Sequence, residues 1–393
     1  MDPDFAALDA YLDEHNLDGY AFADDESNSD LYYTTGFGAP DPFVGVYTPD
    51  ETAILVSSLE YGRAKKEARA DTVKRRSEYE PREKQAEYGE DRVQQKVVSE
   101  FLADVGVESV ATQHGFPAGL ADGLREEGVT VDPESTASGV VTDVRAVKTE
   151  EELEYVREAQ KANENAMAAA EALIREATVE DGVLQYEGEP LTSERVTEEI
   201  EVALIREGCA LDETIVACGA DAADPHDRGS GPLEAGETII IDIFPRNKAS
   251  KYHADMTRTF VKGEATDTQR DWHAVTDEAR KAALDAVEAG ATGEEVNQAV
   301  VDVYQDAGHP TVFTDPDTET GFIHSTGHGV GLDVHEAPSI SLNGEELEAG
   351  HVITIEPGLY DPAVGGVRIE DIVVVTEDGY ENLTDYPIEL EVE

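Results

Sequence analysis

The chain has 393 residues, enough for two domains of ordinary size, and 40% of them are hydrophobic, which argues against a disordered acidic chain. Its 87 Asp and Glu against 29 Lys and Arg give a formal net charge of −58, so its surface repels nucleic acid and anionic membranes. Because the acids are spread along the whole chain and the Debye length falls to about 3 Å at 1 M salt, we hypothesise a halophilic protein.

The beginning of the chain shows no targeting signal. Residues 5–16 have the acidic, amphipathic pattern of a short helix and lack the basic and apolar regions of a signal peptide. No apolar run approaches the ~20 residues that cross a bilayer. Cys209 and Cys218 do not resemble a disulfide framework, and we expect both to be core residues. These features predict a cytoplasmic protein with no membrane partner.

Residues 1–147 alternate between strand-like and helical patterns. Strands are expected at 19–23, 31–33, 43–47 and 53–57, and helices at 61–70 and 81–103. The alternation predicts a smaller α/β domain with a mixed sheet, in which no catalytic constellation is visible.

Residues 148–393 are expected to form a second domain of the α+β class. It begins with a long helix at 150–176, for which Thr149 and Glu152 form a capping box. Further helices are expected at 192–207, 267–289 and 294–307, and strands around 214–218 and 369–376. Together with the repeat described next, this pattern predicts a sheet of antiparallel hairpins with helices packed on it.

One segment of this second domain is present in two copies. The tripeptide Glu-Ala-Gly at 234–236 precedes an Ile-rich run that ends in Asp242, and the same tripeptide at 348–350 precedes a similar run followed by Glu356. Both acids lie eight residues after the opening Glu. The repeat predicts two similar hairpins.

Each copy continues to a second acid, Asp255 in the first and Glu370 in the second. The β-branched runs before the first acids are typical of strands that are buried on both faces. An ionised carboxylate in such a place costs several kcal/mol unless it is paired or binds a cation. A single acid could equally lie at the solvated end of its strand, but four acids in a repeated pattern favour a shared cation site.

Three histidines, His324, His328 and His335, lie within twelve residues. Glycines on both sides of His328 would let a backbone or a ligand approach closely, although a turn with hydrogen-bonded histidines is the alternative. Four carboxylates and one imidazole suit a pair of divalent ions. Hard oxygen ligands with a single nitrogen favour Mn²⁺ and leave Co²⁺, Fe²⁺ and Zn²⁺ open.

These residues stand in motifs that resemble those of the Xaa-Pro peptidase family, the prolidases and proline-specific aminopeptidases. The motifs are Asp-Met-Thr-Arg-Thr at 255–259, Gly-His-Gly-Val-Gly-Leu-Asp-Val-His-Glu at 327–336, Ile-Glu-Pro-Gly at 355–358 and Val-Arg-Ile-Glu-Asp at 367–371. Residues 31–37 and 144–152 resemble the creatinase-type N-terminal domain and its junction. The resemblance therefore covers nearly the whole chain. It implies a pita-bread catalytic domain whose halves are related by pseudo-twofold symmetry.

The resemblance also implies a set of metal ligands. Asp242 would chelate one metal ion and His328 the other, while Asp255 and Glu370 would bridge the two. Glu356 would be both a ligand and the general base.

The resemblance implies roles for four further residues. His226 would donate a hydrogen bond to the scissile amide or the tetrahedral intermediate, although a surface histidine is the alternative. His335 would bind the substrate carbonyl, and His324 and Arg368 would line the site. The implied substrate is a peptide or dipeptide with proline at the second position, and the implied assembly is a homodimer.

The chain departs from the family pattern in one place. The segment Ile243-Phe244-Pro245 follows the first acid where family members usually have one residue and then Gly, and the gap to Asp255 is longer than usual. Because the hairpin at 244–251 flanks the expected site, this departure bears on the substrate preference more than on metal binding. Asp371, beside Glu370, is not expected to be a ligand because adjacent side chains of a strand point to opposite faces.

The leading hypothesis is a dinuclear metallopeptidase that hydrolyses Xaa-Pro bonds at the N-terminus of peptides or in dipeptides. A general or methionine-type aminopeptidase of the same fold is the nearest alternative, and the N-terminal domain argues against it. A non-catalytic pita-bread module that binds a basic partner such as a histone, or a creatinase-like hydrolase without metal, would be expected to lack some of the five ligands. The choice between dipeptidase and aminopeptidase stays open.

Overall fold

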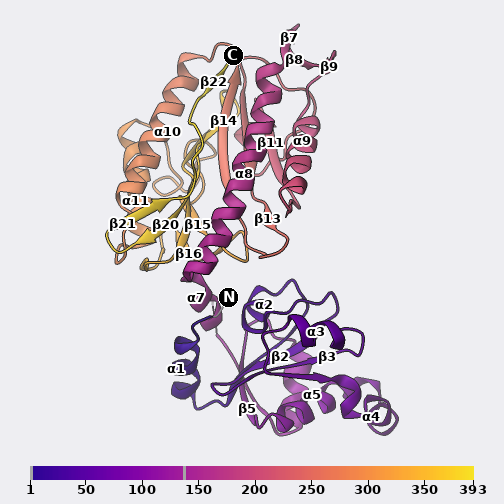
Figure 1. Ribbon diagram of the computed structural model, residues 1–393. Helices are drawn as coiled ribbons and strands as arrows, with labels where there is room; N and C mark the ends of the chain where they lie inside the picture. Colours follow the sequence, from indigo (N-terminus) through magenta and orange to yellow (C-terminus); the bar gives the residue numbers. More distant parts are fainter. Residues whose placement is uncertain (1–2, 136–138) are drawn as a thin grey trace. The chain divides into compact units, whose positions relative to one another are not determined.

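The computed structural model describes residues 3–135 and 139–393, and its contacts divide the chain into two units, Met1–Arg145 and Ala146–Glu393 (Figure 1). None of the helices in the described residues combines the length and the apolar composition of a bilayer span.

Unit 1 is built on a six-stranded mixed sheet with the strand order β4-β3-β2-β1-β5-β6. Its strands are β1 (Gly19–Asp24), β2 (Phe43–Tyr47), β3 (Thr52–Val56), β4 (Thr72–Arg75), β5 (Ser109–Thr112) and β6 (Thr130–Pro133). The pairs β1–β2 and β2–β3 are antiparallel, whereas β3–β4, β1–β5 and β5–β6 are parallel. The predicted mixed α/β sheet is confirmed.

The helices of unit 1 include two departures from the predicted elements. They are α1 (Ala6–His15), α2 (Ser29–Thr35), α3 (Tyr61–Glu67), α4 (Pro81–Tyr88), α5 (Val93–Asp104), α6 (Ala118–Glu126) and α7 (Val140–Ala146). The strand predicted at 31–33 is wrong: the Asn28 side chain caps the helix α2 by accepting from Leu31 N, and Gly36 ends it at φ +62°. The helix predicted at 81–103 is broken at Gly89, which has φ +86°.

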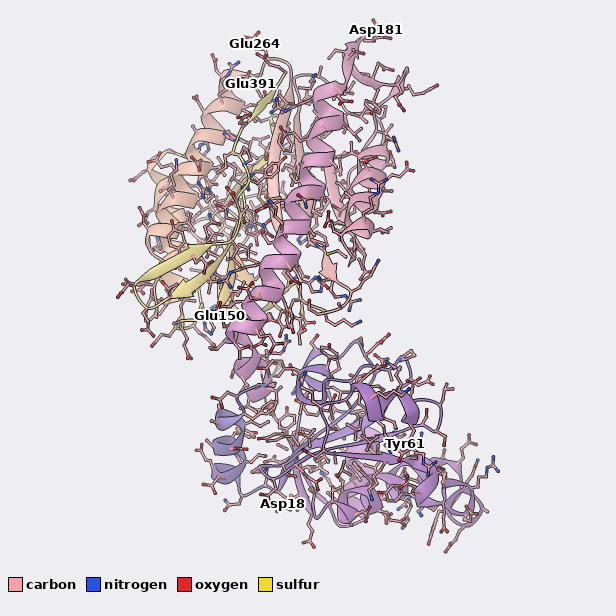
Figure 2. All side chains as sticks on the ribbon, viewed as in Figure 1. Asp18, Tyr61, Glu150, Asp181, Glu264 and Glu391 are labelled. Atoms are coloured by element: carbon pink, nitrogen blue, oxygen red, sulfur yellow. The ribbon has the colours of Figure 1, made fainter. Side chains whose placement is uncertain are left out.

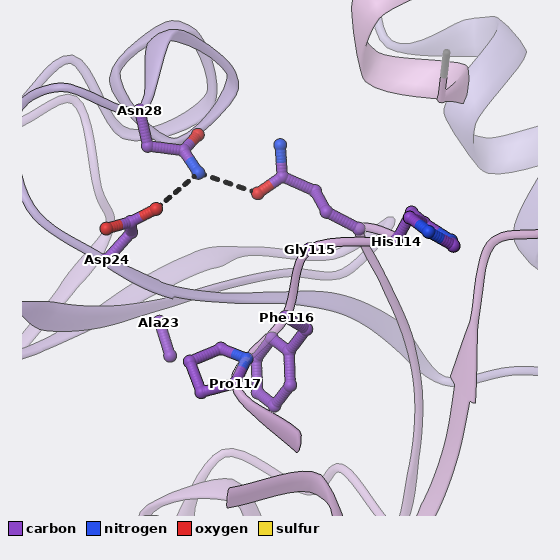
Figure 3. Close-up of a pocket in the computed structure, with 8 residues that line it drawn as sticks. Ala23, Asp24, Asn28, His114, Gly115, Phe116 and Pro117 are labelled. Carbon is purple, nitrogen blue, oxygen red and sulfur yellow. Dashed lines mark hydrogen bonds between the residues drawn. The ribbon is translucent and has the colours of Figure 1, made fainter. Parts of the chain in front are cut away.

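Unit 1 has a pocket where the parallel strands β1 and β5 end (Figure 3). Its lining consists of Ala23, Asp24, Asn28, Gln113, His114, Gly115, Phe116 and Pro117. The Asn28 amide donates to the Asp24 carboxylate (3.0 Å) and to the Gln113 carbonyl (2.8 Å). These polar groups therefore satisfy one another.

Unit 2 consists of two layers that each combine a helix pair with a sheet, and the strands of both sheets are antiparallel except for the short last strand of the chain, which pairs in parallel. The first layer has α8 (Glu150–Glu176) and α9 (Ser193–Arg206) on the sheet β11-β12-β14-β22 (Figure 1). Its strands are β11 (Thr214–Cys218), β12 (Thr238–Ile243), β14 (Met256–Lys262) and β22 (Glu391–Val392). Helix α8 begins with the predicted capping box of Thr149 and Glu152.

The second layer repeats this plan. Helices α10 (Asp267–Asp285) and α11 (Gly293–Asp306) pack on the sheet β16-β15-β17-β20-β21. Its strands are β15 (Gly327–Gly329), β16 (Glu336–Ile340), β17 (Val352–Ile355), β20 (Asp371–Thr376) and β21 (Gly379–Asn382), and the hairpin of β18 (Gly358–Asp361) and β19 (Gly365–Arg368) lies between β17 and β20 in the chain. The two hairpins predicted from the sequence repeat are β12–β14 and β17–β20.

Smaller elements complete unit 2. They are β7 (Thr178–Glu180), β8 (Val183–Tyr186), β9 (Glu189–Pro190), β10 (Cys209–Ala210) and β13 (Arg246–Asn247). Both cysteines are free thiols: Cys209 is buried in the first core cluster, and the half-buried Cys218 packs against it. The acid excess lies outside, as the side chains of Glu150 (78% exposed) and Glu264 (91% exposed) illustrate (Figure 2).

A buried ion cluster joins the two layers behind the strands. The Asp371 carboxylate of β20 accepts from Arg258 of β14 (2.9 Å) and from Arg280 of α10 (2.6 Å), and the Asp371 side chain is 3% exposed. Arg258 also donates to the backbone carbonyl of Glu370 (2.6 Å). Asp371 is thus engaged on the side of the strand away from Glu370, as alternation predicts.

The variant Asp371→Asn should be strongly destabilised, because it removes the buried carboxylate that Arg258 and Arg280 share, although Arg280 keeps its pair with Asp277. Removing one partner of a buried ion pair costs about 3–5 kcal/mol, to be measured as the free energy of unfolding in urea. The matched control is Glu381→Gln, because Glu381 pairs with Arg157 on the surface (2.8 Å) and its loss should cost about 0–1 kcal/mol. Equal losses in the two variants would contradict the assignment.

Candidate metal centre

The five predicted ligands come from strand ends of the two layers. Asp242 lies in β12, Asp255 directly before β14, His328 in β15, Glu356 directly after β17 and Glu370 directly before β20. The pairing of Asp242 with Thr257 in the β12–β14 ladder fixes the first two relative to each other. The strands thereby bring four carboxylates and one imidazole to one buried place.

Three of these residues form a compact group. One oxygen of Asp255, one nitrogen of His328 and one oxygen of Glu370 lie within 4.8 Å of one another. His328 Nε2 is 3.7 Å from Asp255 Oδ2 and 3.2 Å from Glu356 Oε1. Glu356 therefore borders the same group.

The electrostatics of the site fit a divalent cation. Burial first, and then repulsion from neighbouring carboxylates, raise the pKa of Asp255 and of Glu370 well above the ordinary range. Among the residues that the structure describes, Asp242 Oδ1 is buried and has no hydrogen-bond partner. Buried acids and an unpaired carboxylate oxygen are costly unless a cation compensates them, and this donor set suits hard or borderline metal ions.

His328 is held with one nitrogen toward the acids. Its Nδ1 lies 3.1 Å from the carbonyl of Gly329, which leaves Nε2 for the carboxylates. A Cβ atom on Gly327 would lie 2.0 Å from the carbonyl oxygen of Thr354, and one on Gly329 would lie 2.0 Å from that of Ala337. The glycines around His328 therefore serve the close approach of neighbouring backbone.

Arg368 is directed at the first acid. Its guanidinium donates to Asp242 Oδ2 (2.5 Å), Thr257 Oγ1 (3.0 Å) and the Tyr360 hydroxyl (3.1 Å). Tyr360 is completely buried and also lies 3.0 Å from His324 Nε2. Tyr360 thus connects two predicted residues, and the sequence reasoning missed it. The sequence feature that could have identified Tyr360 is its position two residues after Gly358 of the Ile-Glu-Pro-Gly motif.

The two remaining histidines lie around the group. The His335 ring is exposed and stands edge-on to the His328 ring, with centroids 4.2 Å apart. His226 is exposed, and the carbonyl of the preceding Pro225 accepts from Arg368 (3.4 Å). Burial, and after it the charge of Arg368, lowers the pKa of His324, while partial desolvation beside His328 lowers the pKa of His335. Both rings are therefore favoured as neutral imidazoles.

The long hairpin at 244–251 is held at both ends by helix α8. Asn163 donates to the carbonyl of Ile243 (2.7 Å), and the Tyr252 hydroxyl donates to Glu152 (2.5 Å). Within the hairpin, β13 pairs with β10. The Phe244 ring, two residues after Asp242, has the Arg228 guanidinium 5.9 Å from its centroid. The sequence did not identify Asn163 or the contact of Glu152 with Tyr252, since both bonds link positions about 80 to 100 apart.

Comparisons with known proteins agree with this arrangement. Residues 154–377 match metallopeptidase family M24, and residues 5–147 match the creatinase/prolidase N-terminal domain. The Xaa-Pro dipeptidase of Pyrococcus furiosus is 31% identical over 381 residues, which is 95% of each chain. The crystal structure of the prolidase from Pyrococcus horikoshii has a TM-score of 0.78 at 26% identity and 98% coverage of both chains. The dipeptidase PepE from Mycobacterium ulcerans has a TM-score of 0.77 at 28% identity, with 99% of this chain and 96% of that one covered.

The variant Asp255→Asn should separate the stability of the metal-free protein from metal binding. It removes one of several mutually repelling charges, so the melting temperature without metal should equal or exceed that of the wild type. Mn²⁺ at 100 times its Kd should stabilise the wild type by about 2.7 kcal/mol and leave Asp255→Asn nearly unchanged. Melting curves with Mn²⁺ and with EDTA check this. Glu264→Gln, at an exposed position, is the control; a full metal-induced shift in Asp255→Asn would contradict the site.

Proposed function

Because the chain belongs to metallopeptidase family M24, with a creatinase/prolidase N-terminal domain before its pita-bread catalytic domain, we propose that it is a metal-dependent Xaa-Pro dipeptidase. The observation that carries the proposal is the compact group of Asp255, His328 and Glu370, which borders Glu356 and lies beside the unpaired oxygen of Asp242. A non-catalytic module would not need to keep this costly set of buried acids.

The ligand assignment is part of the proposal. Asp242 would hold one of two divalent ions and His328 the other, with Asp255 and Glu370 shared between them and Glu356 as a further ligand. The oxygen-rich donor set favours Mn²⁺. When bound, such ions polarise a carbonyl group and make water a nucleophile near neutral pH.

Glu356 is proposed as the general base. Its Oε1 atom accepts from Thr354 Oγ1 (3.1 Å) and faces His328 Nε2, so the carboxylate is oriented from two sides. In this position it can take the proton from the attacking water and deliver it to the proline nitrogen as the amide breaks. Bond cleavage requires that delivery because the proline nitrogen must be protonated to leave as a neutral amine.

The histidines around the group are proposed to bind the substrate. The pKa of His335 is lowered by partial desolvation and by His328, which favours a neutral ring, and one of its nitrogens would donate to the substrate carbonyl. His226, exposed at the edge, would donate to the scissile amide or to the tetrahedral intermediate. His324 and Arg368 would line the site, and the bond from Arg368 to Asp242 also orients the first ligand.

The substrate is proposed to be a dipeptide with proline at the second position. Proline has a fixed φ and a ring that a rigid pocket can select. The names of the relatives that match along nearly the whole chain support a dipeptidase. The match of the N-terminal domain disfavours a general aminopeptidase. The hairpin at 244–251, with Phe244 close to the first acid, is proposed to adjust the substrate preference.

Several properties of the whole protein complete the proposal. The domain boundary is placed between residues 147 and 148, which the end of the N-terminal match at residue 147 supports. We expect a cytoplasmic homodimer. The net charge of −58 favours activity at molar salt, where surface repulsion is screened.

The variant Glu356→Gln should lose Xaa-Pro hydrolysis, because its amide cannot accept the proton from water. We expect kcat to fall by about 10²–10⁴-fold, measured as proline release from Ala-Pro with Mn²⁺ in molar KCl. Bound metal is measured in the same samples, because Glu356 is also a proposed ligand. Glu346→Gln, at an exposed position, should keep full activity. Substantial residual activity of a metal-loaded Glu356→Gln enzyme would remove Glu356 from the base role.

A substrate length series distinguishes a dipeptidase from an aminopeptidase. With the metal-loaded wild type, kcat/KM for Ala-Pro should exceed that for Ala-Pro-Ala by at least about tenfold, which is 1.4 kcal/mol of differential binding. Ala-Ala serves as the control for the proline requirement. Equal values for the dipeptide and the tripeptide would instead assign the enzyme to the aminopeptidases.

A further inference from the structure

In the turn at 331–336, the His335 side chain is exposed, and the side chain of the next residue, Glu336, is buried. The His335 ring is exposed beside His328, so packing does not enclose it. The Glu336 side chain, where the chain enters β16, is only 2% exposed. Because His335 and Glu336 are consecutive residues, an anchor on Glu336 restrains the backbone that carries the His335 ring.

Glu336 is anchored by a lysine from a distant part of the chain. Lys148 Nζ donates to Glu336 Oε1 (2.5 Å), and the Lys148 side chain is 0% exposed. The same ammonium group donates to the carbonyl of Ala146 (3.0 Å), and the Lys148 backbone N–H donates to the carbonyl of Gly350 at the turn before β17. The lysine is therefore fixed at its backbone and at its charged end.

The Glu336 carboxylate also organises the turn itself. Its second oxygen accepts from Asp333 N (3.3 Å). A Cβ atom on Gly331 would lie 2.3 Å from Glu336 Oε1, so the carboxylate lies directly against the Gly331 backbone. The Gly331 carbonyl accepts from His253 N (2.8 Å), two residues before Asp255. The turn from 331 to 336 is thus closed around the carboxylate.

The pairing of β15 with β16 places this anchor next to His328. His328 is opposite Ser339, whereas Gly329 is opposite Glu336, so the β16 strand has extra residues in a bulge at this point. Bulges redirect side chains and are frequent beside active sites. The anchored residue is consequently opposite the residue that follows His328.

We propose that Lys148 and Glu336 are positioning residues for His335, and that their buried ion pair holds the turn 331–336 so that the His335 imidazole stays against His328 and the substrate. A buried ion pair adds little net stability compared with apolar residues of the same volume, so fold stability alone does not account for it. The geometry of the Lys148–Glu336 pair does account for how the exposed His335 ring keeps a fixed direction. The inference rests on the proposed role of His335 in substrate binding.

A double-mutant cycle tests the coupling. Lys148→Met with Glu336→Met replaces both partners of the pair by apolar side chains, and His335→Ala removes the ring. In the wild-type background the paired replacement should lower kcat/KM for Ala-Pro by about 10–100-fold, because small displacements of a positioning group have effects of this size. In the His335→Ala background it should lower kcat/KM by no more than about twofold. Equal losses in both backgrounds would overturn the proposal.

Hydrogen exchange of the metal-free protein gives a readout that is independent of activity. The amides of 331–337 should exchange faster in the Lys148→Met/Glu336→Met protein, while those of α8 and β12 keep their protection. Unchanged exchange of this turn would also overturn the proposal. If the double variant does not fold, Glu336→Gln, which keeps an acceptor for Lys148, goes through the same cycle.

Two controls complete the design. Arg157→Gln removes a surface partner of Glu381 in the same unit and should change neither kcat/KM nor the exchange of the turn. A wild-type protein that fails to cleave Ala-Pro would disprove the proposed function, whereas active wild type with additive losses would disprove the positioning role alone.

Discussion

Mutual repulsion among buried carboxylates is the constraint on which the catalytic unit depends. The strands bring Asp242, Asp255, Glu356 and Glu370 to one place from which water is largely excluded, and each acid raises the cost of ionising the others. Arg368 compensates Asp242, His328 compensates Glu356, and the Thr257 hydroxyl donates to Glu370 (2.7 Å). Burial and the charges of Glu370, Asp242 and Glu356 all raise the pKa of Asp255, which makes it an acid that a cation would stabilise strongly.

The same strands use their opposite faces to hold these acids in position. Glu370 faces the site while Asp371 binds two arginines behind it, and His335 faces outward while Glu336 binds Lys148 inside. In each case the reactive side chain has few direct contacts, and the following residue has strong ones. The buried ion pairs of Asp371 and Glu336 therefore restrain the backbone of the residues directly before them, because each anchored residue is bonded to its neighbour along the chain.

The sequence predicted what is local or repeated. The twofold Glu-Ala-Gly pattern predicted the hairpins β12–β14 and β17–β20, and the capping box at Thr149 predicted the start of α8. Tyr32 and Tyr33 suggested a strand, but the Asn28 cap and the left-handed Gly36 decide for a helix, because end groups can outweigh the weak propensity of a short segment. The motifs of the family supplied the ligand candidates, which the strands then place together.

Contacts between distant positions could not be predicted in this way. Lys148 and Glu336 are 188 residues apart, and neither has a local pattern that suggests a buried partner. The contact of the Tyr360 hydroxyl with His324, 36 residues earlier in the chain, likewise has no local pattern that predicts it. A single sequence contains the residues of such networks but not their pairing, since the pairing arises only when the two layers pack.

The acid excess and the internal ion pairs respond differently to salt. Exposed pairs such as Arg157 with Glu150 are screened when the Debye length shrinks to about 3 Å near 1 M salt, and they contribute little to stability. The pairs of Lys148 with Glu336 and of Arg258 with Asp371 are shielded from ions by burial. Dilution of salt therefore increases repulsion over the surface while it leaves these internal anchors intact. Loss of structure at low salt would accordingly begin with the expansion of the whole unit, not with local displacement of the buried carboxylates.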